Sequence, residues 1–344
     1  MKKSLLITAD DYGVHDTIDD GIIRCLHNID CIDIIVTHDS SKRRIQNLIT
    51  EHGGKIKNGE IKLGLHLNLN VGKPLYRDPN SEVGKKYLRI IAKAQGRMSD
   101  EGSEFKHKHV TGIMLNIKRI ILHKEALKEE IRCQFNAFKE YTGGMVPAHV
   151  SSHSGVFSGH PKMYELLKEV CLELDNLPIR CPSLIAYDLY RDDYNDLERW
   201  SKYKQYLLTE SQLNQMKFIP GGSMVRQWML NGQRVQFDVD LKNKEVVSTE
   251  FFVPHFYLQG ESTHFNKIIK LIKDNDHPRE HSYEMVVHPL HFDRKTEYAN
   301  MPRGIKINDV HFMKRKKECK TLSLKSNHWR DKARRSGIDV YSFP

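Results

Sequence analysis

The 344-residue chain lacks a long apolar run: no such run approaches the length of about 20 residues that a membrane-spanning helix needs. Its start, MKKSLLITADDYG, places a basic pair before apolar residues, as a signal peptide does. The apolar stretch from Leu5 to Ile7 is nevertheless too short for that role, and two aspartates follow at once. The sequence also contains no internal repeat and no low-complexity tract. We therefore expect a cytoplasmic, globular protein without a membrane partner.

Cysteine is scarce and shows no spacing typical of a metal ribbon or a redox motif. The six cysteines never form a CxxC pair, and two of them lie on the apolar faces of predicted helices. A disulfide framework or a zinc ribbon needs paired or regularly spaced cysteines. We expect reduced, mostly structural thiols. The six are Cys25, Cys31, Cys133, Cys171, Cys181 and Cys319.

Basic residues exceed acidic ones and give a net charge of +10, which raises the question of a polyanionic partner. They are spread along the chain, and only Lys314 to Lys317 (KRKK) forms a run. No aromatic residues are interleaved with that run, as they are in many nucleic-acid-binding motifs. A solvated helix face explains it better, so no nucleic-acid partner is expected.

Short β-branched or apolar runs alternate with segments of helical period, a pattern typical of βαβ units around a parallel sheet. Apolar residues recur at helical spacing from Lys124 to Phe138, after Pro161, and from Phe265 to Ile272. The predicted strands are Leu5 to Thr8, Asp33 to Val36, Ile61 to Leu65, Val146 to Val150, Leu177 to Arg180, Met285 to His288 and Ile338 to Ser342.

The alternation and the length favour one α/β domain over residues 1–344, a TIM-barrel-like (β/α) barrel with irregular features. Residues 76–123 are polar and basic, and residues 183–262 carry Tyr, Trp and Gly without a steady period. Both segments are predicted to be loop-rich insertions. Long loops on a barrel shape the entrance to the substrate site.

Four motifs place metal-competent side chains at or just beyond predicted strand ends, where α/β barrels carry their catalytic groups. Each motif alone has an ordinary explanation: paired aspartates commonly cap a helix or form a turn, and a single histidine is commonly a satisfied core residue. Together they indicate a metal site of histidine and aspartate ligands. The motifs are ADDYG (9–13), GLHLNLN (64–70), AHVSSHSG (148–155) and EMVVHPLHFD (284–293).

The order of these motifs resembles that of the YdjC/ChbG family of carbohydrate deacetylases. The resemblance spans nearly the whole chain and includes residues 130–134 in a predicted helix. It also includes the LPIRCP segment (177–182), the E-x-x-x-HP pattern of residues 284–289, and a C-terminal helix and strand ending in GIDVYSF. It implies a barrel of the glycoside hydrolase and deacetylase type, and it places KRKK in the last helix.

The resemblance implies that a divalent metal, Mg²⁺ or Zn²⁺, is bound by Asp11, His66 and His153. Two neutral imidazoles and one carboxylate would leave positions open for water and substrate. A bound cation lowers the pKa of water toward neutrality and polarises a carbonyl.

The resemblance also implies three catalytic residues. Asp10 would be the general base, and His288 the general acid that protonates the departing amine. Arg180 would be an orienting cation that helps the metal to stabilise the oxyanion. His149 is expected to contact the residues of the site without binding the metal itself. His15, His38 and His291 are expected to be loop residues and not ligands.

One position departs from the family pattern, since members commonly have Asp where this chain has Ser151. A carboxylate there would orient a neighbouring group more strongly than a hydroxyl does. The departure predicts either a different substrate or reduced activity.

The sequence thus predicts a metal-dependent hydrolase that removes acetyl groups from N-acetylated amino sugars or short oligosaccharides. The alternatives are a metal-dependent hydrolase of another ester or amide, a binding homologue that has lost turnover, and a polyanion-binding protein. The sequence leaves the substrate-binding residues and homo-oligomerisation open.

Overall fold

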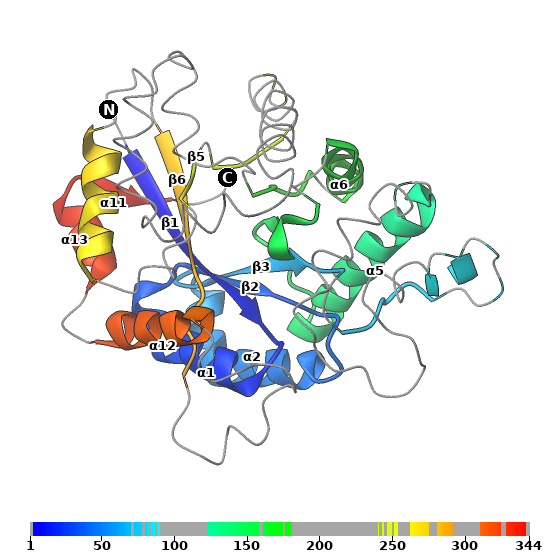
Figure 1. Ribbon diagram of the computed structural model, residues 1–344, viewed down its shortest axis with the longest axis horizontal. Coiled ribbons are helices and arrows are strands. Elements are labelled where there is room, and N and C mark those ends of the chain that lie inside the picture. Colours follow the sequence, from blue (N-terminus) through cyan, green and yellow to red (C-terminus); the bar gives the residue numbers. More distant parts are fainter. Residues whose placement is uncertain are drawn as a thin grey trace.

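The computed structural model describes most of the chain outside two long segments. The described residues are 3–69, parts of 72–89, 121, 123–157, 161–174, 176–180, parts of 240–249, 251–253, 262–274, 281–291, 310–324 and 328–341. Parallel strands form a curled sheet with helices around it (Figure 1), which confirms the predicted α/β barrel-like fold. Most of the predicted insertions at 76–123 and 183–262 lies outside the described residues, and the single-domain assignment stays a prediction.

Strand β1 (Lys3–Tyr12) is the centre of the sheet and contacts three other strands. The strand order is β4-β3-β2-β1-β6-β5, with β7 also paired to β1. Every pairing within this sheet is parallel. The carboxyl ends of the strands therefore meet at one edge. The remaining strands are β2 (Cys31–Ile34), β3 (Lys62–Leu67), β4 (Val150–Ser152), β5 (Phe251–Val253), β6 (His281–Val287) and β7 (Ile338–Val340).

The chain beyond β4 connects the two edges of the curled sheet, β4 and β5. Ile179 forms an isolated parallel bridge with Val150 of β4. Its backbone N–H donates to the carbonyl of Val247, 2.8 Å away, shortly before β5 begins. Since β5 pairs with β6, these contacts lead from one side of the sheet to the other. Residues 177–180 therefore take part in the curled sheet. They do so through a single bridge at Ile179, and not as the strand that was predicted.

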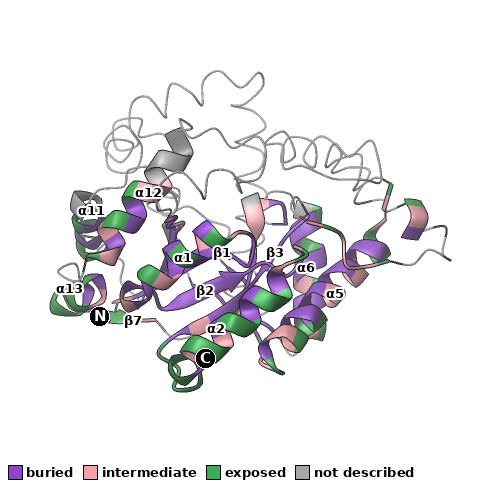
Figure 2. Ribbon diagram, turned by 90° about the horizontal axis from the view of Figure 1, so that it is seen from below, coloured by how far each residue is buried: buried purple, intermediate pink, exposed green. Residues whose placement is uncertain are grey.

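Buried strands and half-buried helices make up the core (Figure 2). The helix predicted from residue 124 is α5 (Lys124–Thr142), which buries Leu127, Ile131, Phe135 and Phe138 along one side. Gly143 ends it in the left-handed conformation, with φ 74°, which glycine adopts without steric cost. The predictions for α6 (Pro161–Glu173) and α11 (Ser262–Asp274) are likewise confirmed.

Two helices, α1 (Asp16–Arg24) and α2 (Ser41–Lys57), and one strand, β5, were not predicted. Helix α1 has Gly21 in its middle, and α2 contains the pair Gly53-Gly54, and both features weaken a helical pattern. Only Ile45 and Leu48 give α2 large buried apolar side chains. Strand β5 is just three residues long and lies in the expected insertion.

The C-terminal region packs against the start of the chain through Asn28. The Asn28 side-chain amide donates to the carbonyl of Leu322, and its side-chain oxygen accepts from the backbone N–H of Trp329. The Trp329 ring stacks on Phe265, with ring centroids 4.4 Å apart. These contacts fix α12 (Val310–Ser323) and α13 (Trp329–Arg335) beside α1 and α11. The KRKK run lies on α12, which is a helix as the resemblance implied, but α13 follows it and is the last helix that the structure describes.

The five described cysteines, all but Cys181, are free thiols, in agreement with the expectation of reduced cysteines. Among the described residues, no helix combines the length and the apolar character needed to cross a membrane.

The packing of α1 against the loop after β6 gives a first prediction. A Cβ added at Gly21 would come within 2.6 Å of the Pro289 carbonyl oxygen and 2.7 Å of Leu290 backbone atoms. Alanine normally stabilises a helix interior by about 1 kcal/mol relative to glycine. Here the crowded backbone outweighs that gain, so Gly21→Ala should lower the free energy of unfolding by about 1 to 3 kcal/mol.

Gly54 in α2 provides the matched control, because nothing lies within 4 Å of an added Cβ there. Gly54→Ala should therefore raise stability by about 0.5 to 1 kcal/mol. Denaturant unfolding of both variants measures the difference. Equal stabilisation by the two substitutions would show that α1 does not approach the loop this closely.

Candidate active site with a possible metal centre

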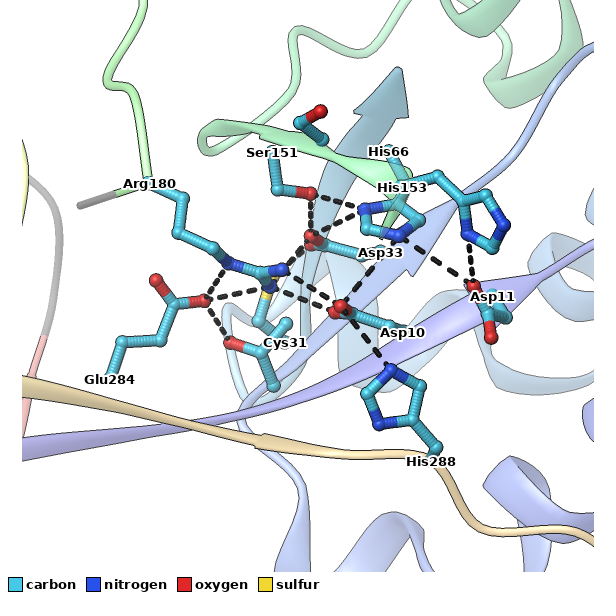
Figure 3. A network of polar contacts seen from close by, with 12 residues as sticks. Asp10, Asp11, Cys31, Asp33, His66, Ser151, His153, Arg180, Glu284 and His288 are labelled. Atoms are coloured by element: carbon cyan, nitrogen blue, oxygen red, sulfur yellow. Dashed lines mark hydrogen bonds and ion pairs between the residues drawn. The ribbon is translucent and has the colours of Figure 1, made fainter. Parts of the chain in front are cut away.

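All six residues assigned to the site from sequence lie together at the carboxyl edge of the sheet (Figure 3). Asp10 and Asp11 belong to the end of β1, and His66 to β3. His153 begins the short helix η2 (His153–Gly155) directly after β4, and His288 follows β6. Arg180 comes one residue after the bridge at Ile179.

An irregularity in β1 turns two consecutive aspartates toward the same site. Residues of a regular strand alternate between the two faces of the sheet. The pairing of β1 with β2 shifts register between Ala9 and Tyr12, and Asp11 has φ 75°. That left-handed conformation is unusual outside glycine and costs about 1 to 3 kcal/mol, less for Asp than for most residues. The strain is what brings both Asp10 and Asp11 into the cluster.

Arg180 lies among three carboxyl groups and is only 8% exposed. Its guanidinium donates two hydrogen bonds to Asp10, each 2.8 Å long, and one of 2.9 Å to Asp33. Its Nε donates to Glu284 Oε1 at 2.9 Å. Burial raises the pKa of Asp10 even though Arg180 acts to lower it. Asp10 is therefore a fixed carboxyl group with increased basicity.

Asp11, His66 and His153 can hold a metal ion, because one ligand atom from each lies within 4.8 Å of the others. Nδ1 of His153 is 2.8 Å from Asp11 Oδ1, and Nε2 of His66 is 3.6 Å from the same oxygen. Burial lowers the pKa of His66 to about 3, so its imidazole is neutral near pH 7. A neutral imidazole has the lone pair that a metal needs.

Asp11 completes this group as a carboxylate. Burial acts to raise its pKa, but His153 and Arg315 outweigh burial and hold the pKa well below its usual range. Two imidazoles and one carboxylate are a donor set that fits zinc and other divalent metals. The residues present therefore fit the ion that the sequence predicted.

Two further groups of side chains come close enough together to share an ion, but their surroundings oppose one. In the first, Cys31 and Asp33 approach different ring nitrogens of His149, Nδ1 and Nε2 respectively. Burial acts to lower the pKa of His149, but Asp33 and Glu284 outweigh it and raise the pKa, which favours the proton over a metal.

The second group combines Asp10, Asp33 and His66. Arg180 already links its two carboxyl groups, since Nη2 donates to both Asp10 and Asp33. A metal there would have to replace a buried guanidinium. The group of Asp11, His66 and His153 is therefore the best candidate.

His288 lies on the other side of Asp10, with Nε2 3.8 Å from Asp10 Oδ2. Its backbone N–H donates to Oε2 of Glu318 on α12, a glutamate that is fully buried. Burial raises the pKa of Glu318 well above its usual range. Burial, followed by the charge of Arg315, lowers the pKa of His288 to about 3. Its imidazole is therefore neutral near pH 7.

Arg315 corrects the interpretation of the basic run as a solvated helix face. Lys317 is exposed, but Arg315 turns into the site, and its Nη2 donates to Asp11 Oδ2 at 2.7 Å. Nothing in the local pattern KRKK separates these residues, because α12 has little amphipathic character along its length. Only the packing of α12 against α1 brings Arg315 to the site.

Asp33 and Glu284 also belong to the cluster, although neither was given a role from sequence. Both are fully buried. The available signal was a single carboxyl residue inside each apolar strand, CIDIIV (31–36) and YEMVV (283–287). His149 contacts Asp33, as expected for a supporting residue.

Ser151 lies directly between His66 and Asp33. Its hydroxyl is 2.6 Å from His66 Nδ1 and also donates to Asp33 Oδ2. A carboxylate is therefore present near His66, but β2 supplies it and not position 151.

The other histidines show local roles where they are described. The His15 ring caps α1 by accepting from the Thr17 backbone N–H, and the His38 ring contacts Ser40. His291 donates its backbone N–H to the Thr17 carbonyl. These contacts agree with their interpretation as loop residues.

The fold and the site define an α/β barrel-like protein with a candidate metal centre at the strand ends, and the comparisons with known proteins identify its family. The model of the YdjC-like protein family matches residues 4–332, so the chain belongs to that family. Among curated proteins, none matches this chain.

Among the solved structures that match, one is similar over nearly the full length of both chains. It is a crystal structure from Enterococcus faecalis V583, provisionally described as that of a cellobiose-phosphate cleavage protein. The TM-score is 0.59 at 16% identity, and the match covers 99% of this chain and 98% of the other. At that identity the likeness confirms the fold alone.

The Arg180 cluster gives a second prediction. Arg180→Met keeps an unbranched apolar stem but leaves buried carboxyl groups without their cation, which should cost about 3 to 5 kcal/mol of folding free energy. In the wild type, burial acts to raise the pKa of Asp33, but His149 and Arg180 outweigh it and lower the pKa. The stabilisation from Asp33 is thus complete above its unfolded pKa and is lost as the pH falls. Without Arg180, the pKa of Asp33 in the folded state rises above its value in the unfolded state. The free energy of unfolding of the variant therefore decreases as the pH rises.

The difference between wild type and variant should therefore be largest near pH 7 and shrink toward pH 4. Chelator-treated proteins and chemical unfolding at several pH values measure it. Arg43→Met removes an exposed arginine and serves as the control. A deficit that is constant with pH would contradict the electrostatic explanation.

Proposed function

We propose that this protein is a metal-dependent hydrolase that removes acetyl groups from N-acetylated amino sugars or short oligosaccharides. One observation carries the proposal: Asp11, His66 and His153 converge on a common point beside a buried Asp10 that Arg180 holds in place. A set of metal ligands next to a fixed proton acceptor is the arrangement that hydrolysis of an amide by an activated water requires.

The balance of charge in the cluster supports a bound cation. The four carboxyl groups at this edge of the sheet outnumber its two guanidinium groups, even with His149 as a further cation through its raised pKa. Excess negative charge in a buried site is costly unless protons or a cation offset it. The acidic side is Asp10, Asp11, Asp33 and Glu284, and the guanidinium side is Arg180 and Arg315.

Asp11, His66 and His153 would hold the ion, which would supply Lewis-acid activation of water and of the acetyl carbonyl. Asp10 then accepts the proton of the attacking water. Its Oδ2 is the oxygen placed for this step, because it lies 3.6 Å from His66 Nε2 and 3.8 Å from His288 Nε2. Arg180 fixes the carboxyl plane through its two hydrogen bonds to Asp10.

Arg180 acts in this proposal on Asp10 and not on the oxyanion. Arg180 donates hydrogen bonds to the carboxyl groups of Asp10, Asp33 and Glu284, and Asp10 lies between its guanidinium and Asp11 (Figure 3). Arg315 is the guanidinium nearer to the ligands, since it contacts Asp11 directly and is 23% exposed.

His288 can protonate the leaving amine once it has received a proton. A neutral imidazole is a poor acid, and His288 is neutral near pH 7 for the reasons given above. The proton that Asp10 accepts is the nearest source, because Asp10 Oδ2 is 3.8 Å from His288 Nε2. We therefore assign the two residues to one proton-transfer path, which leads from the attacking water to Asp10, then to His288 and finally to the leaving amine.

The substrate class rests on the comparisons. The family matched here includes the deacetylases whose motifs the sequence resembles. The structural neighbour is described as a protein that cleaves a phosphorylated disaccharide. The test is acetate release from a panel of N-acetylated mono- and oligosaccharides, including phosphorylated ones, with metal content quantified. Chelation should abolish release, and Zn²⁺ or Mg²⁺ should restore it. Metal binding without release from any acetylated substrate would favour a binding homologue, and hydrolysis of other esters alone would favour the alternative hydrolase.

The role of Asp10 gives a third prediction. Asp10→Asn keeps the shape of the side chain but removes the proton acceptor, so turnover should fall by about 10² or more while metal stays bound. Asp11→Asn, by contrast, should lose metal and activity together. Metal loss in the Asp10 variant with retention in the Asp11 variant would show that the two carboxyl groups have exchanged roles.

The role of His288 gives a fourth prediction. An amine leaves poorly unless it is protonated, so a general acid contributes about 10² to 10⁴ to amide hydrolysis. An aryl acetate releases a stable phenolate and needs little such help. His288→Ala should therefore lose most deacetylation of the amide and retain much of any aryl-ester hydrolysis. Both rates are measured on the same folded, metal-loaded preparation, and equal losses on the two substrates would contradict the assignment.

A further inference from the structure

We propose that Asp33 is a positioning residue that acts through the Ser151 hydroxyl on His66 and thereby prepares Nε2 of that ring to bind metal. The inference rests on the proposed metal site and concerns residues behind it. Asp33 comes from β2, Ser151 from β4 and His66 from β3 between them. All three are almost completely buried, so water cannot take the place of any partner.

The order of donors and acceptors follows from counting protons. Asp33 Oδ2 accepts from Arg180 Nη2 at 2.9 Å and from the Ser151 hydroxyl. A hydroxyl carries one proton, and here that proton points to Asp33. Ser151 Oγ can then only accept from His66 Nδ1, which is 2.6 Å away. The ring proton of His66 therefore resides on Nδ1, and Nε2 carries the lone pair.

The opposite tautomer would suit the site poorly. If Ser151 donated to Nδ1, the proton would reside on Nε2, which faces Asp10 and Asp11 at 3.6 Å. A protonated ring nitrogen cannot bind a metal. The carboxylate of Asp33 thus selects the tautomer from two hydrogen bonds away.

Asp33 is held tightly in this position. Gly64 on β3 leaves it room, because a Cβ there would lie 2.1 Å from Asp33 Oδ1 and 3.0 Å from His149 Cε1. His149 Nε2 is 3.2 Å from Asp33 Oδ1, whereas Ser151 contacts the other carboxyl oxygen, Oδ2. Arg180 joins the same carboxylate to Asp10. One buried side chain therefore positions both a proposed metal ligand and the proposed base.

Metal affinity in a double-mutant cycle tests the connection. Zn²⁺ affinity is measured by chelator competition for wild type, Ser151→Ala, Asp33→Asn and the double variant. Removal of a partner that orients a metal-binding histidine costs about 10- to 100-fold in affinity. Ser151→Ala should lose at least about tenfold. Asp33→Asn should weaken binding when Ser151 is present and have little further effect in the Ser151→Ala protein. Equal losses in both backgrounds would overturn the connection through Ser151.

Two further measurements keep the inference testable if Asp33→Asn does not fold. Ser151→Thr retains a hydroxyl and should restore affinity toward the wild type, whereas Ser248→Ala, which removes another buried hydroxyl, should leave affinity unchanged. Nitrogen NMR of the histidine rings in metal-free wild type should show His66 protonated at Nδ1. Protonation at Nε2, or wild-type affinity in Ser151→Ala, would overturn the proposal.

These readouts do not depend on catalysis. A wild type that shows the Nδ1 tautomer and the predicted cycle, but releases no acetate, would contradict the proposed function and leave this inference intact.

Discussion

The ion pairs of Arg180 are the constraint on which the rest of the site depends. A buried guanidinium is costly to desolvate, and several well-directed carboxylates are needed to offset that cost. Arg180 meets Asp10 from β1, Asp33 from β2 and Glu284 from β6. These strands and the segment after β4 are thereby held in one arrangement, since a shift of any of them would leave a charge buried without its partner.

The site has two halves with different electrostatics. In the first half, the charges of the carboxyl groups and of the Arg180 guanidinium offset each other. In the second half, neutral His66 and the carboxylate of Asp11 lie near His153 and can bind a cation. Asp33 joins the halves, because it contacts both Arg180 and, through Ser151, His66. A strained Asp11 at the end of β1 is the backbone feature that allows the two aspartates to serve different halves.

Much of this arrangement was predictable from the sequence, and the physical reason is topological. Parallel strands end at the same edge of a sheet, so polar residues at strand ends, such as Asp10, His66 and His288, must come together once the strands are identified. The helices with strong periodicity, such as α5, were predictable for a similar reason, since an apolar stripe must be buried.

The parts that were not predictable depend on contacts distant in sequence. Arg315 stands in a basic run without a pattern, and only the docking of α12 aims it at Asp11. Asp33 lies inside a strand, where one carboxyl group gives no indication of its partner. The role of Ser151 was considered at position 151 alone, whereas its effect depends on a carboxylate 118 positions earlier in the chain. The three-residue strand β5 is defined by pairing with β6 and not by its own composition.

The most direct test of this account is the position of a metal ion in crystals of the protein grown with Zn²⁺, located by anomalous scattering at the zinc edge. The account predicts a single strong peak bound by Asp11, His66 and His153, with Arg180 still paired to Asp10. A peak at Cys31, Asp33 and His149, or an absence of zinc from the strand ends in protein that releases acetate, would contradict it.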